Sequence, residues 1–283
     1  MYEISVIMSI YKEKEHILKR SIESILNQSF RNFEFIIVID NPDNKEAITL
    51  IKKYATQDSR IKLHINVCNK GIGASLNKGI NLSRGKYIAR QDADDESLPE
   101  RFEKQIKIFR ENHDIDVVGT GLEYIDENGN TIMKRYYKEK VMNQIKRYSP
   151  LAHPTVLNKK EIFEKYGYYN KYNNVKGVED YDLWCRWYLK GVTFYNIKEI
   201  LYKYYQSSDN VKNKHTKLQL WNTIKTKFKY CLQLHYGIID YLYLFCEICV
   251  LLLLPDKLIT GLFYIITREC SKFQMKIHMQ KHQ

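Results

Sequence analysis

The sequence lacks the cysteine pattern of a disulfide-stabilised domain. Its six cysteines are scattered over 283 residues, which favours a chain that folds without covalent cross-links in a reducing compartment. The N-terminal stretch MYEISVIMSIYKEKE has no basic region ahead of an apolar core, and it runs directly into what resembles a buried strand. We therefore expect no signal peptide and a cytoplasmic location.

Internal repeats, low-complexity linkers and a long uninterrupted apolar run are also missing. The apolar segment 236–255, YGIIDYLYLFCEICVLLLLP, is interrupted by Asp240 and Glu247 and ended by Pro255, and two acids in hydrocarbon would be costly. The next apolar piece, 258–266, is too short to span a bilayer. With 44% hydrophobic and 28% charged residues, the composition is that of an ordinary globular protein.

Positive charge is abundant and concentrated near the C-terminus. The formal net charge is +12, and residues 203–283 hold 12 Lys or Arg against 5 Asp or Glu. This asymmetry indicates attraction to an anionic surface, such as phospholipid or nucleic acid. The C-terminal apolar segments are then helices on the inner face of the cytoplasmic membrane, a helical cap on the rest of the chain, or a contact in a homo-oligomer.

The first half alternates short apolar runs with helical patterns. Strands are predicted at 4–9, 33–40, 61–65 and 86–90, and helices follow each of the first three. This alternation predicts an α/β fold with a parallel sheet covered by helices on both faces, whose ligands bind beyond the carboxyl ends of the strands. Further on we expect a helix near 102–109, two strands around an Asn-Gly turn, a helix over 178–191 and edge strands over 192–206.

Three aspartates, Asp92, Asp94 and Asp95, follow the fourth predicted strand. The next helix start is explained separately by a Ser97-x-x-Glu100 capping box with Pro99 in the first turn. Neighbouring carboxylates repel one another unless a cation lies among them, and hard oxygen ligands suit Mg²⁺ or Mn²⁺. The alternative is a set of ordinary acids near a helix N-terminus.

Several motifs in succession resemble glycosyltransferase family 2, with its GT-A fold. They are VIMSIYKEKEHILKRSIESILNQSFRNFEFIIVID, NKGIGASLNKGINLSRGKYIARQDADD, HPTVLNKKEIFEKYGYYN and VEDYDLWCRW. The likeness covers about residues 3–206 and is greatest to bacterial enzymes that build capsule, exopolysaccharide and O-antigen. It implies a GT-A domain over 1–208, with a nucleotide-sugar-binding half at 1–98 and an acceptor-binding half at 99–208, followed by a basic and apolar helical extension at 209–283.

The resemblance implies roles for residues around the nucleotide-sugar, which we expect to be UDP-linked. Asp94, with Asp92, would hold Mn²⁺ or Mg²⁺ on the diphosphate, Asp92 would also contact the nucleoside or sugar, and Asp95 would support them. Further expected contacts to the nucleotide are Tyr11, Glu13, Asp40, Arg84 and His153. Two departures from the family pattern, Ser9-Ile10-Tyr11 and Asp40-Asn41-Pro42-Asp43, alter the rim of the nucleoside pocket.

The acceptor side carries a Glu179-Asp180 pair. By resemblance Asp180 is the base that removes a proton from the acceptor hydroxyl and Glu179 orients it, whereas the structural alternative is an acidic helix N-terminus that includes Asp182. Leu183 replaces the glutamine of processive synthases, which favours addition of a single sugar. The implied activity is an inverting, metal-dependent transfer to a lipid-linked saccharide at the membrane surface, with no nucleic-acid partner. The rival is a basic nucleic-acid- or anionic-surface-binding protein without catalysis.

Overall fold

In the computed structural model, residues 2–141, 143–171, 175–206, 216–255 and 258–259 are described. Their strands form one mixed sheet in the order β3-β2-β1-β4-β8-β6-β9-β5, with β7 paired to β6. The first four strands are parallel: β1 (Ile4–Ile10), β2 (Phe33–Ile39), β3 (Ile61–Ile65) and β4 (Tyr87–Asp92). The predicted α/β fold with a parallel first half is confirmed.

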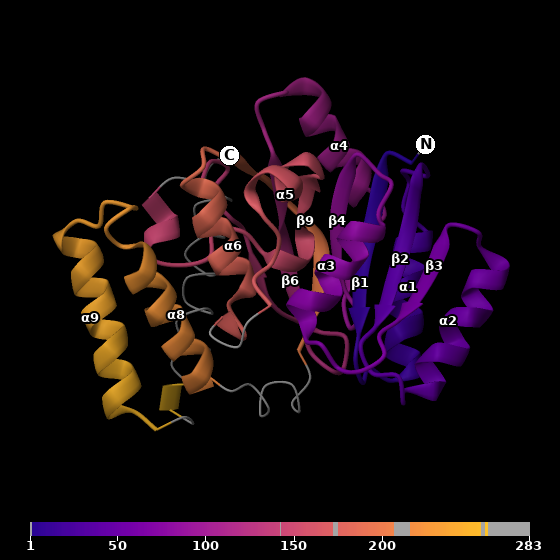
Figure 1. Ribbon diagram of the computed structural model, residues 1–283, viewed down its shortest axis with the longest axis horizontal. Helices are drawn as coiled ribbons and strands as arrows, with labels where there is room; N and C mark the ends of the chain where they lie inside the picture. The colour runs from indigo at the N-terminus through magenta and orange to yellow at the C-terminus, as the bar shows by residue number, and fades with distance from the viewer. Residues whose placement is uncertain (1, 142, 172–174, 207–215, 256–257, 260–283) are drawn as a thin grey trace.

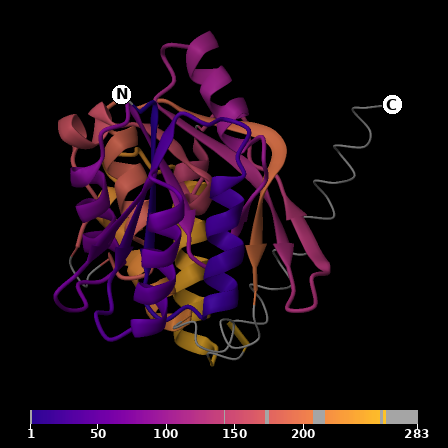
Figure 2. The same cartoon turned by 90° about the vertical axis from the view of Figure 1, so that its right-hand side faces the viewer.

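Helices cover both faces of this sheet because its central strands are buried on both sides. Val6 and Met8 of β1 belong to one core with α1 (Glu15–Leu26), α2 (Lys45–Gln57) and α4 (Arg101–Glu111). Ile7 points the other way, into a second core with α3 (Ile72–Leu82), α5 (Glu161–Tyr166) and α6 (Glu179–Tyr188). Figure 2 shows the orange and yellow C-terminal helices behind the indigo and purple first half.

The second half of the chain completes the sheet with mixed directions. The predicted hairpin is β6 (Val117–Ile125) and β7 (Thr131–Arg135), and β8 (Leu157–Lys159) runs antiparallel between β4 and β6. The segment predicted as edge strands is one long strand, β9 (Phe194–Tyr205), parallel to β6. It has a neighbour on each side, because the two-residue β5 (Glu96–Ser97) pairs with its outer side.

The predicted capping box of α4 is wrong. The helix begins at Arg101 after Glu100, and no side chain caps it. Ser97 lies in β5, where its hydroxyl donates to Gln91 Oε1 at 2.7 Å and accepts from the guanidinium of buried Arg101 at 2.7 Å. A buried polar network therefore holds the serine that the local pattern assigned to the helix start.

The C-terminal helices pack against the end of the molecule farthest from α2. Figure 1 shows α8 (Thr216–Tyr230) between α6 and the outermost helix, α9 (Ile238–Leu253). Two short 3₁₀ turns, η1 (Asn143–Lys146) and η2 (His153–Thr155), lie in the loops before β8. In the described ranges no helix has the length and apolar character needed to cross a membrane.

Candidate active site

The carboxyl ends of β1, β2 and β4 meet at one edge of the sheet. Ile10 is in register with Ile39, and Ser9 with Asp92, so the residues that follow these strands emerge side by side. The fold thereby brings together four sequence-predicted positions: Tyr11, Glu13, Asp40 and Asp92. This is the edge at which open α/β sheets bind ligands.

Asp40 organises the loop between β3 and α3. One of its carboxylate oxygens accepts from Asn66 Nδ2 at 2.7 Å and the backbone N–H of Lys70 at 2.9 Å, and the other accepts from the N–H of Gly71 at 2.9 Å. Gly71 has a φ of 83°, which residues with a Cβ rarely adopt. The buried carboxylate fixes the strained loop, and its contact with a nucleoside stays a prediction.

The turn after β1 presents an aromatic ring. Glu13 Oε2 accepts from the backbone N–H groups of Tyr11 at 2.7 Å and Lys12 at 3.1 Å, and Asn44 Nδ2 donates to the carbonyl of Tyr11 at 3.3 Å. With its backbone held in this way, Tyr11 remains 44% exposed. A fixed, open tyrosine ring at this edge is suited to stacking against a planar base.

The DADD segment is held mainly through its backbone. Ser21 Oγ donates to the carbonyl of Asp92 at 2.9 Å, and Arg20 Nη2 donates to the carbonyl of Asp94 at 2.7 Å. Both donors come from α1. The carboxylate of Asp92 is paired with the buried guanidinium of Arg90. This neutralises one of the three clustered acids.

The other two acids of the segment, Asp94 and Asp95, lie where their protonated forms are favoured. Burial, followed by the charges of Asp92 and Glu13, raises the pKa of Asp94 to about 6. Burial and its two neighbouring acids also raise the pKa of Asp95 well above its ordinary value. Asp95 accepts the N–H of Tyr205 at 2.9 Å through Oδ1, whereas its buried Oδ2 has no hydrogen-bond partner in the part of the chain that the structure describes.

This surplus of buried carboxylate fits a divalent cation. Within the described ranges, however, no three His, Cys, Asp or Glu side chains are gathered so that they would hold a metal by themselves. Mg²⁺ in particular is commonly bound by one or two carboxylates, with substrate phosphates and water completing its shell. Asp92 and Asp94 supply that pair of carboxylates.

The first turn of α6 contains acids of two different kinds. Burial raises the pKa of Asp180 to about 6, and the charge of Glu179 acts in the same direction. Ser149 Oγ lies 3.4 Å from Asp180 Oδ2. Burial also raises the pKa of Glu179. The pair is thus placed in surroundings that favour uptake of a proton.

Asp182, two residues after Asp180 in the same helix, is a structural acid. It is fully buried and accepts from Arg186 Nε at 3.0 Å, Lys229 Nζ at 2.9 Å and the hydroxyl of Tyr230 at 2.8 Å. Burial alone would raise its pKa, but these donors together hold the pKa below the ordinary value. Arg186 also donates to the carbonyl of Tyr168 at 2.7 Å, so its role is structural.

His153, in η2, contacts Tyr169 and Trp184. Its Nε2 is 2.9 Å from the hydroxyl of Tyr169, and its ring packs edge-on to Trp184. Burial, then the charge of Arg90, lowers its pKa well below the ordinary value, so the imidazole is neutral near pH 7. Burial raises the pKa of Tyr169, and the charges of Asp180 and Asp92 act in the same direction.

Arg84 is not brought to this edge. It precedes β4, and its backbone N–H donates to Glu34 Oε1 at 2.6 Å beside the amino ends of the strands. Tyr87, three residues later, is in register with Ile4 at the start of β1. Arg84 therefore lies at the opposite end of the sheet from Asp40 and Asp92, and we do not retain it as a candidate nucleotide contact.

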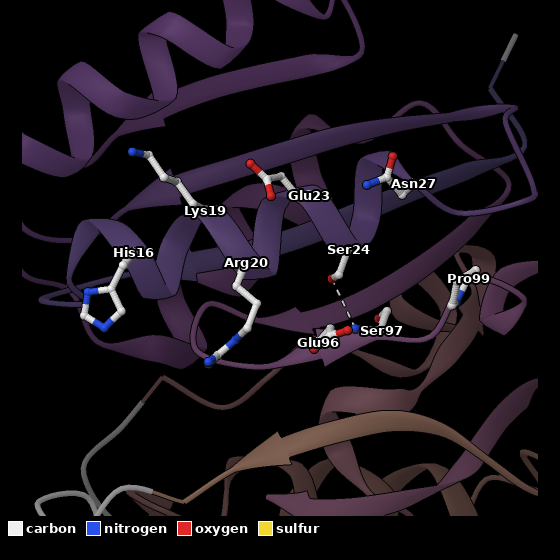
Figure 3. Close-up of a pocket in the computed structure, with 9 residues that line it drawn as sticks. All are labelled: His16, Lys19, Arg20, Glu23, Ser24, Asn27, Glu96, Ser97 and Pro99. Carbon is white, nitrogen blue, oxygen red and sulfur yellow. Dashed lines mark hydrogen bonds between the residues drawn. The ribbon is translucent and has the colours of Figure 1, made fainter. Parts of the chain in front are cut away.

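A groove of about 530 Å³ runs beside α1, outside the candidate residues. It is lined by His16, Lys19, Arg20, Glu23, Ser24, Asn27, Glu96, Ser97 and Pro99 (Figure 3). The N–H of Ser97 donates across it to Ser24 Oγ at 3.1 Å. Arg20 connects the groove to the site, because its guanidinium stacks 3.4 Å from the ring centre of Tyr205 while holding the carbonyl of Asp94.

Sequence reasoning missed Arg20, Arg90 and Ser149 as parts of the site. One usable signal was Arg90, a charged residue inside the apolar strand YIARQD. Arg20 occupies an unremarkable helical position, and Ser149 approaches Asp180 from a loop 31 residues away in the chain. Only the tertiary arrangement reveals these two.

A parallel sheet with acids at its carboxyl edge, joined to a half that carries a second acidic pair, defines a GT-A type glycosyltransferase. The model of "Glycosyl transferase family 2" matches residues 5–167. The chain belongs to glycosyltransferase family 2, which confirms the predicted family and enzyme class. The rival hypothesis of a binding protein without catalysis is wrong.

Similar proteins include enzymes named for polysaccharide synthesis. An uncharacterized glycosyltransferase of Methanocaldococcus jannaschii is 43% identical over 80% of this chain and 79% of its own length. The putative glycosyltransferase EpsE of Bacillus subtilis is 35% identical over 86% of each chain. The O-antigen biosynthesis glycosyltransferase WbnJ of Escherichia coli is 37% identical over 65% of this chain and 70% of its own.

The fold is also similar to that of a protein of known structure, TarS of S. aureus. The structure of S. aureus TarS 1-349 in complex with UDP-GlcNAc matches 88% of this chain and 80% of its own, with a TM-score of 0.61 and 16% identity. The UDP complex of the same protein matches 78% of this chain and 65% of its own, with a TM-score of 0.60 and 20% identity. These matches support the GT-A fold.

Proposed function

We propose that the protein is an inverting glycosyltransferase that moves a single sugar from a UDP-linked donor to a lipid-linked saccharide during bacterial surface polysaccharide synthesis. One observation carries the proposal: Asp94 follows β4 at the carboxyl edge of the sheet, Asp180 lies in the first turn of α6, and burial raises the pKa of each to about 6. Transfer from a nucleotide-sugar needs one acidic group for the diphosphate end and another for the acceptor hydroxyl.

The donor assignment rests on the sheet edge that carries Tyr11, Glu13 and the DADD segment. TarS, which has the same fold, was solved with UDP and with UDP-GlcNAc. Asp94 and Asp92 would hold Mn²⁺ or Mg²⁺, and such an ion, when bound, offsets the charge that develops on the leaving diphosphate. Arg20 and Ser21 keep the backbone of these two aspartates in place.

The chemical step is a single displacement with Asp180 as base. The acceptor hydroxyl oxygen bonds to the anomeric carbon while its proton passes to the Asp180 carboxylate. The bond from that carbon to the diphosphate oxygen breaks, and its electron pair leaves with UDP. Attack from the face opposite the leaving group inverts the anomeric configuration. Glu179 lies beside the base, where its charge favours the protonated form of Asp180.

A saccharide acceptor agrees with the aromatic residues of the second half. Tyr124, Tyr137 and Tyr204 pack partly buried around Leu122 and Tyr202. The charge of Asp180 influences the acidity of Tyr137, so the base lies near this cluster. Relatives named for O-antigen and amylovoran biosynthesis support a polysaccharide product, and a lipid-linked acceptor is our extension of that similarity.

Two substitutions separate donor binding from chemistry. Asp94→Asn should weaken Mn²⁺-dependent UDP binding by roughly tenfold or more, because a metal-binding carboxylate is lost. Asp180→Asn should leave UDP binding nearly unchanged and lower turnover by about 10²–10⁴-fold. Calorimetry with UDP and Mn²⁺, followed by transfer assays over a panel of nucleotide-sugars, measures both effects.

Asp126→Asn, in the exposed turn between β6 and β7, is the matched control and should change neither quantity. Normal turnover by Asp180→Asn would contradict the assignment of Asp180 as the base. UDP binding of equal strength with and without Mn²⁺ would contradict the proposed metal dependence.

A further inference from the structure

Both acidic residues of α9 face inward. Asp240 is buried and pairs with Arg147 Nε at 2.9 Å and Lys146 Nζ at 3.8 Å. Glu247 pairs with buried Lys227 of α8 at 2.5 Å. In the sequence, these two acids interrupt the apolar segment and make contact with lipid unfavourable. In the structure, both are paired with cations on the side of the helix that faces the protein.

The opposite side of α9 is exposed and apolar. Its exposed side chains other than Cys246 are between 42% and 82% accessible: Ile238, Ile239, Tyr241, Leu242, Tyr243, Phe245, Leu252 and Leu253. Phe228 and Leu232, from the end of α8 and the turn after it, are 53% and 78% accessible. This is the reverse of a solvent-facing helix, whose outer side is ordinarily polar. An exposed apolar helix face of this kind marks an interaction site.

We propose that this outer face of α9 docks the protein on a bilayer containing anionic phospholipid. Apolar side chains enter the interfacial region of the bilayer, and neighbouring cations are attracted to acidic headgroups. Lys225 lies 4.9 Å from the ring centre of partly exposed Trp221 on α8, which is a combination suited to a membrane interface.

The charges near the outer face of α9 favour an anionic bilayer over a second copy of the chain as its partner. Helix α8, beside this face, carries Lys217, Lys225, Lys227 and Lys229 and no acid. The two acids of α9 itself, Asp240 and Glu247, face inward. A symmetric contact would place the same basic region on both sides of the interface, where like charges repel. An anionic bilayer supplies the opposite charge.

The packing of α9 favours a helix lying along the surface. Leu244, on its inner side, is buried in a cluster with Leu220 and Ile224 of α8. That side is therefore covered by protein while the other is open. With its 16 residues, the helix presents an apolar strip about 24 Å long.

Vesicle binding by the full chain tests the proposal, without donor or metal. The probes are phosphatidylcholine vesicles with and without phosphatidylglycerol, read by co-sedimentation. Leu242→Ser with Phe245→Ser removes exposed apolar area without changing charge, and Val67→Ser with Leu82→Ser is the matched control on exposed residues outside α8 and α9. We expect binding to be stronger with anionic lipid, and roughly tenfold or more weaker in the α9 variant alone.

Tryptophan fluorescence gives a second readout. Trp184 and Trp187 are fully buried, whereas Trp221 is 45% exposed beside the proposed surface. Quenching by brominated lipid should therefore report Trp221. Absence of vesicle binding would overturn the proposal, as would equal binding by both double variants.

Self-association is the competing outcome. A dimer in sedimentation equilibrium that the α9 substitutions dissociate, together with no vesicle binding, would assign the face to a second copy. The membrane proposal does not depend on the proposed reaction. Asp94→Asn should therefore bind vesicles as strongly as the unaltered protein. Loss of vesicle binding would thus contradict the membrane proposal alone, and loss of Mn²⁺-dependent UDP binding would contradict the proposed function alone.

Discussion

Two carboxylates in α6, Asp180 and Asp182, differ in what surrounds them. Asp182 has three donors, from Arg186, Lys229 and Tyr230, that stabilise its ionised form. Asp180 has the hydroxyl of Ser149 at 3.4 Å and the like charge of Glu179 nearby. Asp182 is fully buried and yet keeps a lowered pKa, so the donors around each acid, and not burial alone, determine which of the two accepts a proton near neutral pH.

Asp180→Asn should stabilise the donor-free protein near pH 7 although it lowers turnover. The folded-state pKa of about 6 lies above the ordinary 3.8. The folded protein therefore binds this proton more tightly than the unfolded chain, and stability is lost as pH rises from about 4 through about 6. Removing the carboxylate should recover up to about 3 kcal/mol of unfolding free energy at about pH 7.5.

Urea denaturation at several pH values measures this difference. The advantage of Asp180→Asn should shrink as pH falls through about 6 toward 4, because the carboxyl of the folded, unaltered protein becomes protonated over that range. Asp182→Asn should have the opposite sign near pH 7, since it removes a stabilised anion. A destabilised Asp180→Asn protein at about pH 7.5 would contradict the raised pKa.

At the scale of elements, α8 holds α6 at two places. Gln219 and Asn222 donate to the carbonyls of Gly177 at 3.0 Å and Lys176 at 2.9 Å, just before the Glu179–Asp180 pair. Lys229, near the other end of α8, reaches Asp182. Truncation at about residue 210 would remove all of these contacts. Surface substitutions on α9 are therefore the cleaner test of membrane docking.

Lys229→Met combined with Tyr230→Phe should destabilise the protein by about 2–4 kcal/mol, because buried Asp182 would keep only Arg186 as a partner. Turnover should fall with α6 disturbed, while UDP binding at the other half stays nearly unchanged. Denaturant melts and calorimetry measure the two effects. Lys225→Met, one turn earlier on α8 and exposed, should cost no more than about 0.5 kcal/mol. An equal cost for both variants would show that the Asp182 contacts contribute nothing.

The elements of the first half could be predicted because each has one clear period. The burial of β2 on both faces and the i, i+4 spacing of Leu18 and Ile22 are visible in the letters. The three-residue strand β8 has no such pattern, and β9 alternates like an edge strand although β5 covers its outer side. Both β8 and the covered edge of β9 depend on pairing between segments far apart in the chain, so the local sequence pattern does not predict them.

The candidate site was predictable where residues follow strands. Tyr11, Asp40 and Asp92 meet because parallel strands end at a common edge. Arg84 was misplaced because it precedes its strand, at the other end of the sheet. The partners that tune the site, such as Arg20 on Asp94 and Arg90 on Asp92, depend on tertiary contacts or on charge pairing within one strand. Family resemblance supplies the roles of the acids but not these supports.

At the scale of the whole molecule, the C-terminal helices share a core with the catalytic half. Tyr230 and Leu234 belong to the same buried cluster as Trp184 and Val117. Arg147, in the loop after η1, reaches Asp240 of α9. The division of the chain near residue 208 into two domains stays a prediction. These contacts join α8 and the start of α9 to the part of the fold that precedes them.

Hydrogen exchange should therefore show α8 opening together with α6. The amides of residues 222–227 lie in a helix whose inner side is buried, so their exchange should require the same free energy of opening as the core of α6. The exposed turn at 126–130 is the internal reference and should exchange far faster. Exchange of α8 at the rate of that turn would mean that the C-terminal helices unfold by themselves. Matched protection of α8 and α6 would instead mean that α8, against which the proposed lipid-facing helix packs, opens together with the helix that carries the base.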